Sequence, residues 1–538
     1  MIARARAAWS NSFRVAGPAD DRRTDSRAIR TDCSSHENRM IENLICVATC
    51  TSTMENGIGQ HAIELAFDIR RGRVSPVDVI DETFERIDRF DDELNAFVYL
   101  REEDAREEAA AAERALENGE PVGPLHGVPV ALKDLDSHVE GMPYTFGGVK
   151  PLGEQLPERT SVTVQRLQDA GAIVVGSTNS PEFGAAGDTT NPMFGSTGNP
   201  FDAAKTAGGS SGGSASAVGA GMVPLALGSD VAGSLRIPAS VCGTYGLKPT
   251  PGLVPNESQP DLFRDAAPFA SYSGLTRTVG DTALLLDVIA GEHPRDPLSV
   301  PGTDAEYRDA VDRSIAGLSV AFSPDLGVYD VEEPVLDAVE DVLDTLREAG
   351  ATVERVDVDF SVPFDALLEC YNTLLNSSLS AAVEGIARET GIDLLGEHRD
   401  ELSPHVVDFI EDGYEYSAVE YEQASVVRSR AYEAIQRVLN GHDLLVTPTL
   451  ATPPWEKGAL APDEIAGEAP ETDKETFLTW PLNLTGHPAA SIPAGRSAEG
   501  LPIGAQLIGS RFAEGTILAA SAAIERRQPW MDKYPTRP

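Results

Sequence analysis

Two stretches near the middle of the chain combine serine with glycine at high density: GGSSGGSASA at 208–217 and GSDVAGSLR at 228–236. A serine hydroxyl becomes a nucleophile only when a neighbouring group accepts its proton. Neither stretch contains a histidine, the most common acceptor. Because glycine loses more backbone entropy on folding than other residues, its repetition indicates a segment that must follow a tight course. The residues therefore raise two questions: which serine reacts, and which side chain takes its proton.

Three interpretations of the first stretch are open. A phosphate-binding loop closes on a lysine, whereas Lys205 precedes the glycines. The spacing G-x-S-x-G at 208–212 matches the nucleophile elbow of serine hydrolases, which follows a strand and requires a later histidine. The preceding residues, NPFDAAKTA, have no strand pattern, and His442 and His487 are the available histidines. A plain low-complexity loop is the third interpretation.

Lys133 offers a different proton acceptor. It ends the apolar run VPVALK, an unusual place for a charge in a chain with only seven lysines. A neutral amine can act as a base if burial lowers its pKa from about 10.4 to about 7. Such a shift lies within the range of about 3–5 units that full burial can produce. A lysine base therefore requires a dry pocket, and the alternative is an ordinary strand-end lysine with its amine in solvent.

Four segments together resemble the amidase signature family in order and in spacing. They are ALKD at 131–134, GGSSGGSASA at 208–217, GSDVAGSLRIPAS at 228–240 and YGLKPT at 245–250. Further segments similar to the family follow in family order at 267–291, 443–453, 480–495 and 500–512. The resemblance covers residues 54 to 530. It implies an α/β fold with a large mixed sheet, the hydrolysis of a carboxylic acid amide, and no cofactor or metal.

Carried over by position, the resemblance implies a Ser-Ser-Lys triad. Ser234 matches the nucleophile, Ser210 matches the bridging serine whose preceding peptide bond is cis in the family, and Lys133 matches the base. A proton would pass from Ser234 through Ser210 to Lys133 as the hydroxyl attacks, and would then return to the departing amine. The intermediate would be an acyl-enzyme on Ser234, and no histidine is required.

The residues before the nucleophile form a predicted oxyanion hole. The backbone N–H groups of Val231, Ala232 and Gly233, together with that of Ser234, can converge on a carbonyl oxygen as it becomes negative. The family has Gly-Gly before the nucleophile, so Ala232 replaces a glycine. Alanine keeps its N–H but resists positive φ, which puts the geometry of the hole in question.

Four further residues match positions around the triad. Ser229 stands where the family has threonine, and Ser211 follows the bridging serine. Asp230 and Arg236 flank the nucleophile loop, where they could form an ion pair. We expect Ser211, Asp230 and Arg236 to be supporting residues, and Cys242 to be a small core residue rather than a nucleophile.

One position bears on the identity of the amide. The glutaminase subunit of tRNA-dependent amidotransferases, a branch of the same family, places an aspartate five residues before the proline of the segment that matches WPLNLTG. This chain has Thr476 at that distance from Pro481, which argues against glutamine; the glutaminase subunit is the alternative function. Four residues either form an apolar acyl pocket or belong to the core: Tyr144, Phe477, Trp480 and Leu482.

From residue 58 the chain alternates amphipathic helical patterns with short apolar runs. Helices are expected at 58–71, 76–91, 102–117, 160–170, 334–349 and 417–440, and strands at 128–134, 172–176, 351–358 and 443–449. This alternation predicts an α/β fold in which helices cover both faces of a mixed sheet. The Pro- and acid-rich stretch 453–475 is expected to be a surface loop.

The chain is strongly acidic. Its 85 Asp and Glu outnumber 43 Lys and Arg, a formal net charge of −42, which argues against the basic footprint that nucleic-acid binding needs. With lysine so scarce, this balance favours adaptation to a high-salt cytosol over an ordinary acidic protein. The five cysteines lack metal-ligand spacing and no apolar run approaches about 20 residues, so we expect a cytoplasmic location without a membrane span.

Residues 1–53 differ in composition from the rest of the chain. They hold eight arginines and six acidic residues, a net charge of +2. We predict that this segment is a disordered extension or precedes a true start at Met54, and that 54–538 form a single amidase domain. The expected partner is a small-molecule amide, without direct nucleic-acid or membrane contact, and a homodimer is left open.

Overall fold

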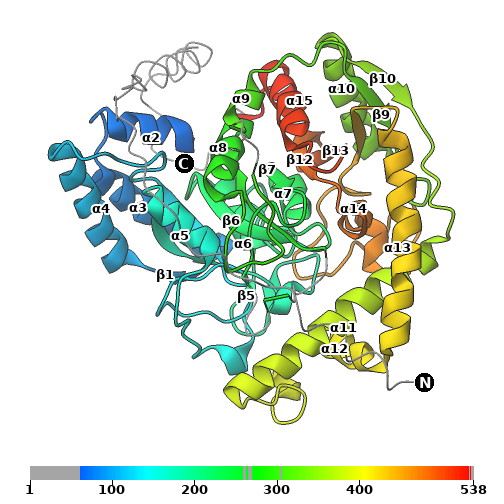
Figure 1. The fold of residues 1–538 in the computed structure, drawn as a ribbon, viewed down its shortest axis with the longest axis horizontal. Coiled ribbons are helices and arrows are strands. Elements are labelled where there is room, and N and C mark those ends of the chain that lie inside the picture. Colours follow the sequence, from blue (N-terminus) through cyan, green and yellow to red (C-terminus); the bar gives the residue numbers. More distant parts are fainter. Residues whose placement is uncertain (1–60, 258–261, 264–268, 303–305, 532–533, 535–538) are drawn as a thin grey trace, which may run out of the picture. The chain divides into compact units, whose positions relative to one another are not determined.

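An 11-stranded mixed β-sheet runs through the computed structural model, which describes residues 61–257, 262–263, 269–302, 306–531 and 534 (Figure 1). The strand order is β1-β3-β2-β6-β8-β7-β12-β13-β11-β9-β10. The strands are β1 Phe97–Leu100, β2 Pro129–Lys133, β3 Ile173–Thr178, β6 Leu225–Asp230, β7 Tyr245–Lys248, β8 Ser271–Thr276, β9 Ser319–Phe322, β10 Thr352–Arg355, β11 Leu444–Pro448, β12 Ala489–Arg496 and β13 Pro502–Gly509. A separate short ribbon pairs β4 Thr190–Asn191 with β5 Gly195–Ser196.

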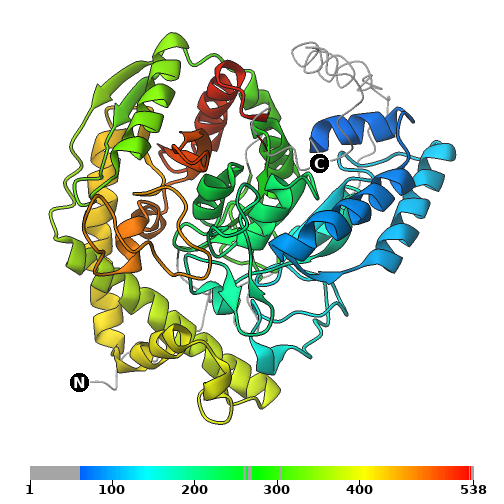
Figure 2. The ribbon, with the colours of Figure 1, turned by 180° about the vertical axis from the view of Figure 1, so that it is seen from behind.

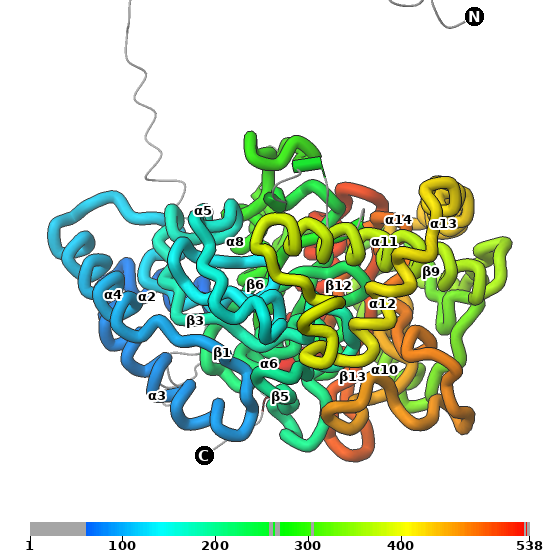
Figure 3. The backbone as a smooth tube through the Cα atoms, turned by 90° about the horizontal axis from the view of Figure 1, so that it is seen from below, coloured from blue at the N-terminus to red at the C-terminus, as the bar shows by residue number. Residues whose placement is uncertain are grey.

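Helices cover both faces of the sheet, as the alternating pattern predicted. They are α2 Ala62–Arg70, α3 Pro76–Leu94, α4 Glu102–Glu117, α5 Val162–Asp169, α6 Gly212–Gly219, α7 Arg236–Cys242, α8 Val279–Ile289, α9 Arg308–Val311, α10 Glu333–Glu348, α11 Phe364–Thr390, α12 Pro404–Glu415, α13 Ala418–Leu439, α14 Trp480–Thr485 and α15 Glu514–Arg527. Helices α2–α4 lie near the β1 end of the sheet and α13 near the other end (Figures 1 and 2). Helices α11 and α12 lie side by side (Figure 3).

The strands divide the apolar residues between two cores because successive side chains point to opposite faces. In β2, Val130 and Leu132 pack into one core, with α2, α5, α8, α10 and α15, while Ala131 packs into the other. Strand β11 repeats the pattern, since Leu444 and Val446 join the first core and Leu445 the second. The predicted α/β fold is thus confirmed down to the alternation within single strands.

Most predicted elements lie within a few residues of their observed bounds. Helix α4 coincides with the predicted 102–117, and α13 differs by one residue at each end from the predicted 417–440. The stretch 453–475 is a loop apart from isolated bridges and a final short turn, η4 Asp473–Thr476. Helices α11 and α12 were not predicted. The predicted extension 1–53 and the boundary at 54 lie outside the described residues, so both stay predictions.

The pairing of β2 with β6 sets the place of the site. The two strands are parallel neighbours, with Val130 opposite Leu225 and Ala131 opposite Ala226. Their carboxyl ends therefore meet at one edge of the sheet, the edge at which open α/β sheets bind ligands. Lys133 is the last residue of β2 and Asp230 the last of β6. No helix in the described part of the chain is long and apolar enough to cross a membrane.

Candidate active site

The amine of Lys133 is enclosed at the end of β2. Its side chain is 0% exposed, and Nζ lies 2.7 Å from Ser210 Oγ and 2.9 Å from Ser229 Oγ, within hydrogen-bond distance of both. Burial lowers the pKa of Lys133 to about 8, although the charges of Asp136 and Asp230 act to raise it. The dry pocket that a lysine base requires is present, and a strand-end lysine with its amine in solvent is excluded.

Ser210 and Ser211 lie on the loop that leads into α6. The Gly209–Ser210 peptide bond is cis, as the resemblance implied. The backbone N–H of Ser211 donates to the Ser234 carbonyl at 3.2 Å, and its hydroxyl donates to the Ser229 carbonyl at 3.3 Å. Ser211 thus ties the glycine-serine loop both to the end of β6 and to the loop that carries Ser234.

Ser234 lies between β6 and α7, in a strand–loop–helix arrangement. The residue is 6% exposed, and its hydroxyl forms no hydrogen bond with any other residue that the structure describes. The G-x-S-x-G spacing at 208–212 has no strand immediately before it, whereas β6 ends four residues before Ser234. Hydrogen bonds at catalytic groups often form only when substrate binds, and a contact between the Ser234 and Ser210 hydroxyls is absent from this structure.

Gly233 cannot be replaced by a larger residue without strain. Its φ is +123°, and a Cβ at this position would collide with the Thr479 side chain. The N–H of Gly233 donates to Asp230 Oδ1 at 2.9 Å. This N–H was predicted to serve the oxyanion hole, but in this structure it already serves the aspartate that holds the loop.

The other N–H groups of this loop remain available for an oxyanion. Those of Val231, Ala232 and Ser234 have no hydrogen-bond partner among the described residues. Ala232 does not have positive φ, and its carbonyl accepts a hydrogen bond from the Thr479 hydroxyl at 2.7 Å. The alanine that replaces the family's glycine is therefore accommodated without left-handed backbone.

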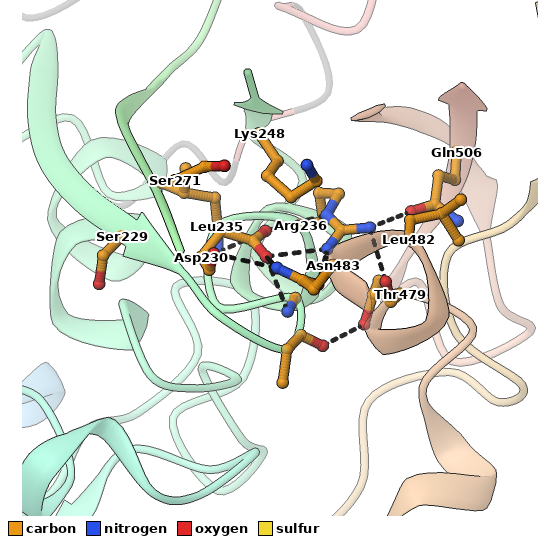
Figure 4. Close-up of polar contacts among 12 residues, drawn as sticks. Ser229, Asp230, Leu235, Arg236, Lys248, Ser271, Thr479, Leu482, Asn483 and Gln506 are labelled. Carbon is orange, nitrogen blue, oxygen red and sulfur yellow. Dashed lines mark hydrogen bonds and ion pairs between the residues drawn. The ribbon is translucent and has the colours of Figure 1, made fainter. Parts of the chain in front are cut away.

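Asp230 and Arg236 form the ion pair that the sequence suggested, and Figure 4 shows it at the centre of a buried network. Arg236 donates to both carboxylate oxygens, at 2.8 and 2.9 Å, and to Asn483 and Gln506. Burial alone would raise the pKa of Asp230, but the charge and hydrogen bonds of Arg236 hold it at about 2. Asp230 also accepts from the N–H of Leu235, so the pair fixes the nucleophile loop.

Two charged residues near the triad were missed by the sequence reasoning. Asp136 Oδ2 lies 3.9 Å from Lys133 Nζ, and the available signal was its place in ALKDLD. Lys248 ends β7 fully buried, and its amine donates to the Pro249 carbonyl at 3.3 Å. Burial, with the charge of Arg236, lowers the pKa of Lys248 to about 7. The signal for it was a second lysine at a strand end, in YGLKPT.

The two candidate histidines contact other groups. His487 is buried, its ring nitrogens pair with Thr485 and Gln436, and burial lowers its pKa to about 3. His442 lies against the Val438 carbonyl. Cys242 is buried, and burial raises the pKa of its thiol, as expected for a core residue. Among the described residues, no group of three or more His, Cys, Asp or Glu could hold a metal ion.

Four residues were expected either to line an acyl pocket or to belong to the core, and three of them belong to the core. Phe477, Trp480 and Leu482 are at most 1% exposed and pack in the second core, where the Trp480 ring lies 5.5 Å from that of Tyr371. Tyr144 is instead half-buried and lies 4.5 Å, ring to ring, from Phe146. Only Tyr144 of the four remains a candidate for substrate contact.

An aromatic row leads from Tyr144 towards Ser210. The ring of Phe146 lies 6.3 Å from that of Phe183, and both residues are half-buried. The next residue, Gly184, approaches Ser210 so closely that a Cβ there would lie 3.0 Å from Oγ. Ala185 then lines a cavity of about 380 Å³, whose other walls are His405 and Phe409 of α12 and residues of the loop 460–473.

Comparison with known proteins identifies the family. The Amidase family model matches residues 78–518. The chain belongs to the amidase signature family. An acylamidase of Rhodococcus erythropolis is 34% identical over 475 residues, which cover 88% of this chain and 96% of the relative. A glutamyl-tRNA(Gln) amidotransferase subunit of Alkaliphilus metalliredigens is also 34% identical, over 85% of this chain and 95% of that one.

Solved structures of the same family share the fold. A bacterial aryl acylamidase superposes with a TM-score of 0.85 at 34% identity, covering 89% of this chain and 99% of the other. A 6-aminohexanoate cyclic dimer hydrolase complexed with substrate superposes with a TM-score of 0.80 at 28% identity, covering 89% and 98%. These relatives confirm the predicted enzyme class, a hydrolase of amide C–N bonds.

Removing the charge of Arg236 should lower the free energy of unfolding of this amidase. Arg236→Met leaves Asp230 buried without its partner, which costs about 3–5 kcal/mol. Urea denaturation measures the loss. The control is Arg399→Met, because the pair of Arg399 with Glu411 is nearly half exposed on both sides and is worth at most about 1 kcal/mol. Equal losses in the two variants would contradict the role given to the buried pair.

Proposed function

We propose that this amidase cleaves its substrate through an acyl-enzyme on Ser234, with Ser210 and Lys133 as the proton relay. The observation that carries the proposal is the enclosed Lys133 amine, 2.7 Å from the Ser210 hydroxyl oxygen. A buried amine whose pKa is about 8 can exchange a proton with a hydroxyl near neutral pH. The hydrogen bond from Ser211 N–H to the Ser234 carbonyl holds the loop of Ser210 close to the loop of Ser234, which supports proton transfer between these two serines.

The relay accounts for each proton in the reaction. As Ser234 Oγ bonds to the amide carbon, its proton moves to Ser210, and the Ser210 proton moves to neutral Lys133. The N–H groups of Val231, Ala232 and Ser234 stabilise the carbonyl oxygen as it becomes negative. The proton then returns through Ser210 to the amide nitrogen, and the C–N bond breaks. Water hydrolyses the acyl-enzyme by the same relay, which releases the acid.

We further propose that the substrate is the acyl amide of an aromatic amine. Tyr144, Phe146 and Phe183 form a row of half-buried rings, and Phe183 directly precedes Gly184, which packs against Ser210. The adjoining cavity, about 380 Å³, is within the range of small-molecule sites and is lined mainly by apolar residues. The names of two relatives, an acylamidase and an aryl acylamidase, favour the same class.

The second candidate is the glutaminase subunit of an amidotransferase, because several relatives of 34% identity are glutamyl-tRNA(Gln) amidotransferase subunits. Thr476 argues against it. The residue is fully buried, and its hydroxyl has no hydrogen-bond partner among the described residues, so this position offers no carboxylate to a glutamine amino group. Co-purification with a partner protein, together with tRNA-dependent ammonia transfer, would favour the glutaminase role instead.

We also propose that the enzyme works in the cytoplasm at high salt. A net charge of −42 produces strong self-repulsion in dilute buffer, and salt screens it. Assays should therefore use molar potassium chloride beside dilute buffer.

Ser234→Ala should abolish amide hydrolysis. Without the hydroxyl no acyl-enzyme forms, and kcat is expected to fall by at least about 1,000-fold. The readouts are product release from an acylanilide and labelling by a fluorophosphonate probe, with the wild-type label mapped to Ser234 by mass spectrometry. Ser216→Ala is the control, because this serine lies on α6 and its hydroxyl donates to the Gly198 carbonyl. Activity in Ser234→Ala near that of wild type would contradict the mechanism.

The pH profile should report the protonation of Lys133. Because the amine must be neutral to accept a proton, kcat/KM should rise with pH and level off above about 8, the pKa of Lys133. The steady-state profile between pH 5.5 and 9.5 measures this limb. Lys133→Ala should lose most activity, and its residual rate should not show the limb. A wild-type rate that is flat from pH 6 to 9 is the contrary outcome.

Shortening a side chain that lines the cavity should lower kcat/KM for aromatic substrates more than for aliphatic ones. Phe409→Ala is expected to lower kcat/KM for an acylanilide by about 10-fold and to change that for an aliphatic primary amide much less. Steady-state kinetics on both substrates give the ratio. Tyr414→Ala on the same helix is the matched control, because Tyr414 is half exposed and its hydroxyl donates to Glu384. Equal losses for both substrates would argue against an aromatic amine in this cavity.

A further inference from the structure

Asp136 is a charged group beside the triad to which the relay gives no role. It lies three residues after Lys133, in the loop that follows β2. Its Oδ2 atom is buried, lies 3.9 Å from Lys133 Nζ, and has no hydrogen-bond partner among the described residues. A carboxylate oxygen removed from water without a hydrogen bond is costly. Its position against the amine therefore calls for a functional explanation.

Ser229 connects Asp136 to Lys133. The Ser229 hydroxyl oxygen lies 2.9 Å from Lys133 Nζ and accepts a hydrogen bond from it. A hydroxyl that accepts one hydrogen bond still has its own proton to donate. Burial raises the pKa of Asp136, and the charge of Lys133 and a hydrogen bond from Ser229 act against that rise. The chain of contacts runs from Ser210 through the amine and Ser229 to Asp136. Each member fixes the direction of the next.

The other acidic groups near Lys133 have partners of their own. Asp230, at the end of β6, is paired with Arg236. Asp134 points to Thr145 and accepts its backbone N–H and its hydroxyl. The Tyr144 hydroxyl, which also lies near Asp136, donates to the Leu135 carbonyl. Lys133 is the one cation within salt-bridge distance of Asp136 among the described residues.

We propose that Asp136 is a positioning residue for this amidase: through Ser229 it holds the Lys133 amine against Ser210, and it stabilises the ammonium that forms when the amine takes the proton. The inference rests on the proposed relay. When Ser234 attacks, a positive charge appears on the buried Nζ, and the carboxylate 3.9 Å away compensates it. The charge of Asp136 also raises the pKa of Lys133. The enzyme should therefore become active at a higher pH than it would with a buried lysine that has no carboxylate beside it.

Asp136→Asn separates this role from a structural one. Removing the opposite charge lowers the pKa of Lys133, so the acid limb of kcat/KM should move down by about 1–3 pH units. The plateau value of kcat should fall about 10-fold, because the ammonium loses its counter-charge. Both acylanilide hydrolysis and fluorophosphonate labelling are measured across pH, with thermal unfolding to confirm that the variant is folded. Asp134→Asn is the matched control: a buried neighbour whose loss should leave the limb in place.

The Ser229 variants decide the case even if Asp136→Asn does not fold. Ser229→Ala breaks the link and should lower kcat about 10-fold with little change in KM, whereas Ser229→Thr keeps a hydroxyl and should restore it. Wild-type kcat in Ser229→Ala, or an unmoved limb in folded Asp136→Asn, overturns the inference. A wild-type enzyme with no acid limb, together with a fully active Lys133→Ala, would instead mean that the relay itself is wrong.

Discussion

The removal of one lysine amine from water is the constraint on which the site depends. Lys133 is enclosed at the end of β2, and the two groups within hydrogen-bond distance of its amine, in the described part of the chain, are uncharged serine hydroxyls. Had a carboxylate bound the amine directly, the ammonium form would be too stable to serve as a base. The site instead keeps Asp136 at 3.9 Å, close enough to influence the amine and too far for a direct hydrogen bond. Protonation and deprotonation of the lysine are thereby kept in reach of neutral pH.

A second buried charge pair, Asp230 with Arg236, has a different task at the end of the neighbouring strand β6. Asp230 and Arg236 are both fully buried and satisfied by several hydrogen bonds, which is the condition under which an internal ion pair is tolerated. Asp230 also accepts hydrogen bonds from the N–H groups of Gly233 and Leu235. The loop around Ser234 is therefore shaped by a group that has no part in proton transfer. Asp230 and Asp136 thus have different tasks: Asp230 holds the backbone of the Ser234 loop, and Asp136 faces the Lys133 amine.

Much of the fold and of the candidate site could be predicted from the sequence, because the patterns that indicate them are local. The run VPVALK identifies a buried strand and a lysine at its end, and helix 102–117 follows from its periodicity alone. What could not be predicted depends on contacts between distant segments. Nothing in DVAGS says that the Gly233 N–H will be taken by Asp230 rather than left for an oxyanion. Trp480 and Phe477 could equally have lined a pocket, and only the packing of Trp480 against α11 and of Phe477 against Trp455 decides that they are core.

The clamp on the nucleophile loop has a consequence for synthesis of the chain. Thr479 holds the Ala232 carbonyl across 247 residues, and Gln506 and Asn483 bind Arg236 across 270 and 247 residues. A nascent polypeptide that has emerged only as far as residue 400 already contains both serines and the lysine, yet it lacks every one of these contacts. If the site works as proposed, hydrolytic activity appears only after these C-terminal segments have been synthesised. Chains that end before residue 479 would carry Lys133, Ser210 and Ser234 without any of these contacts.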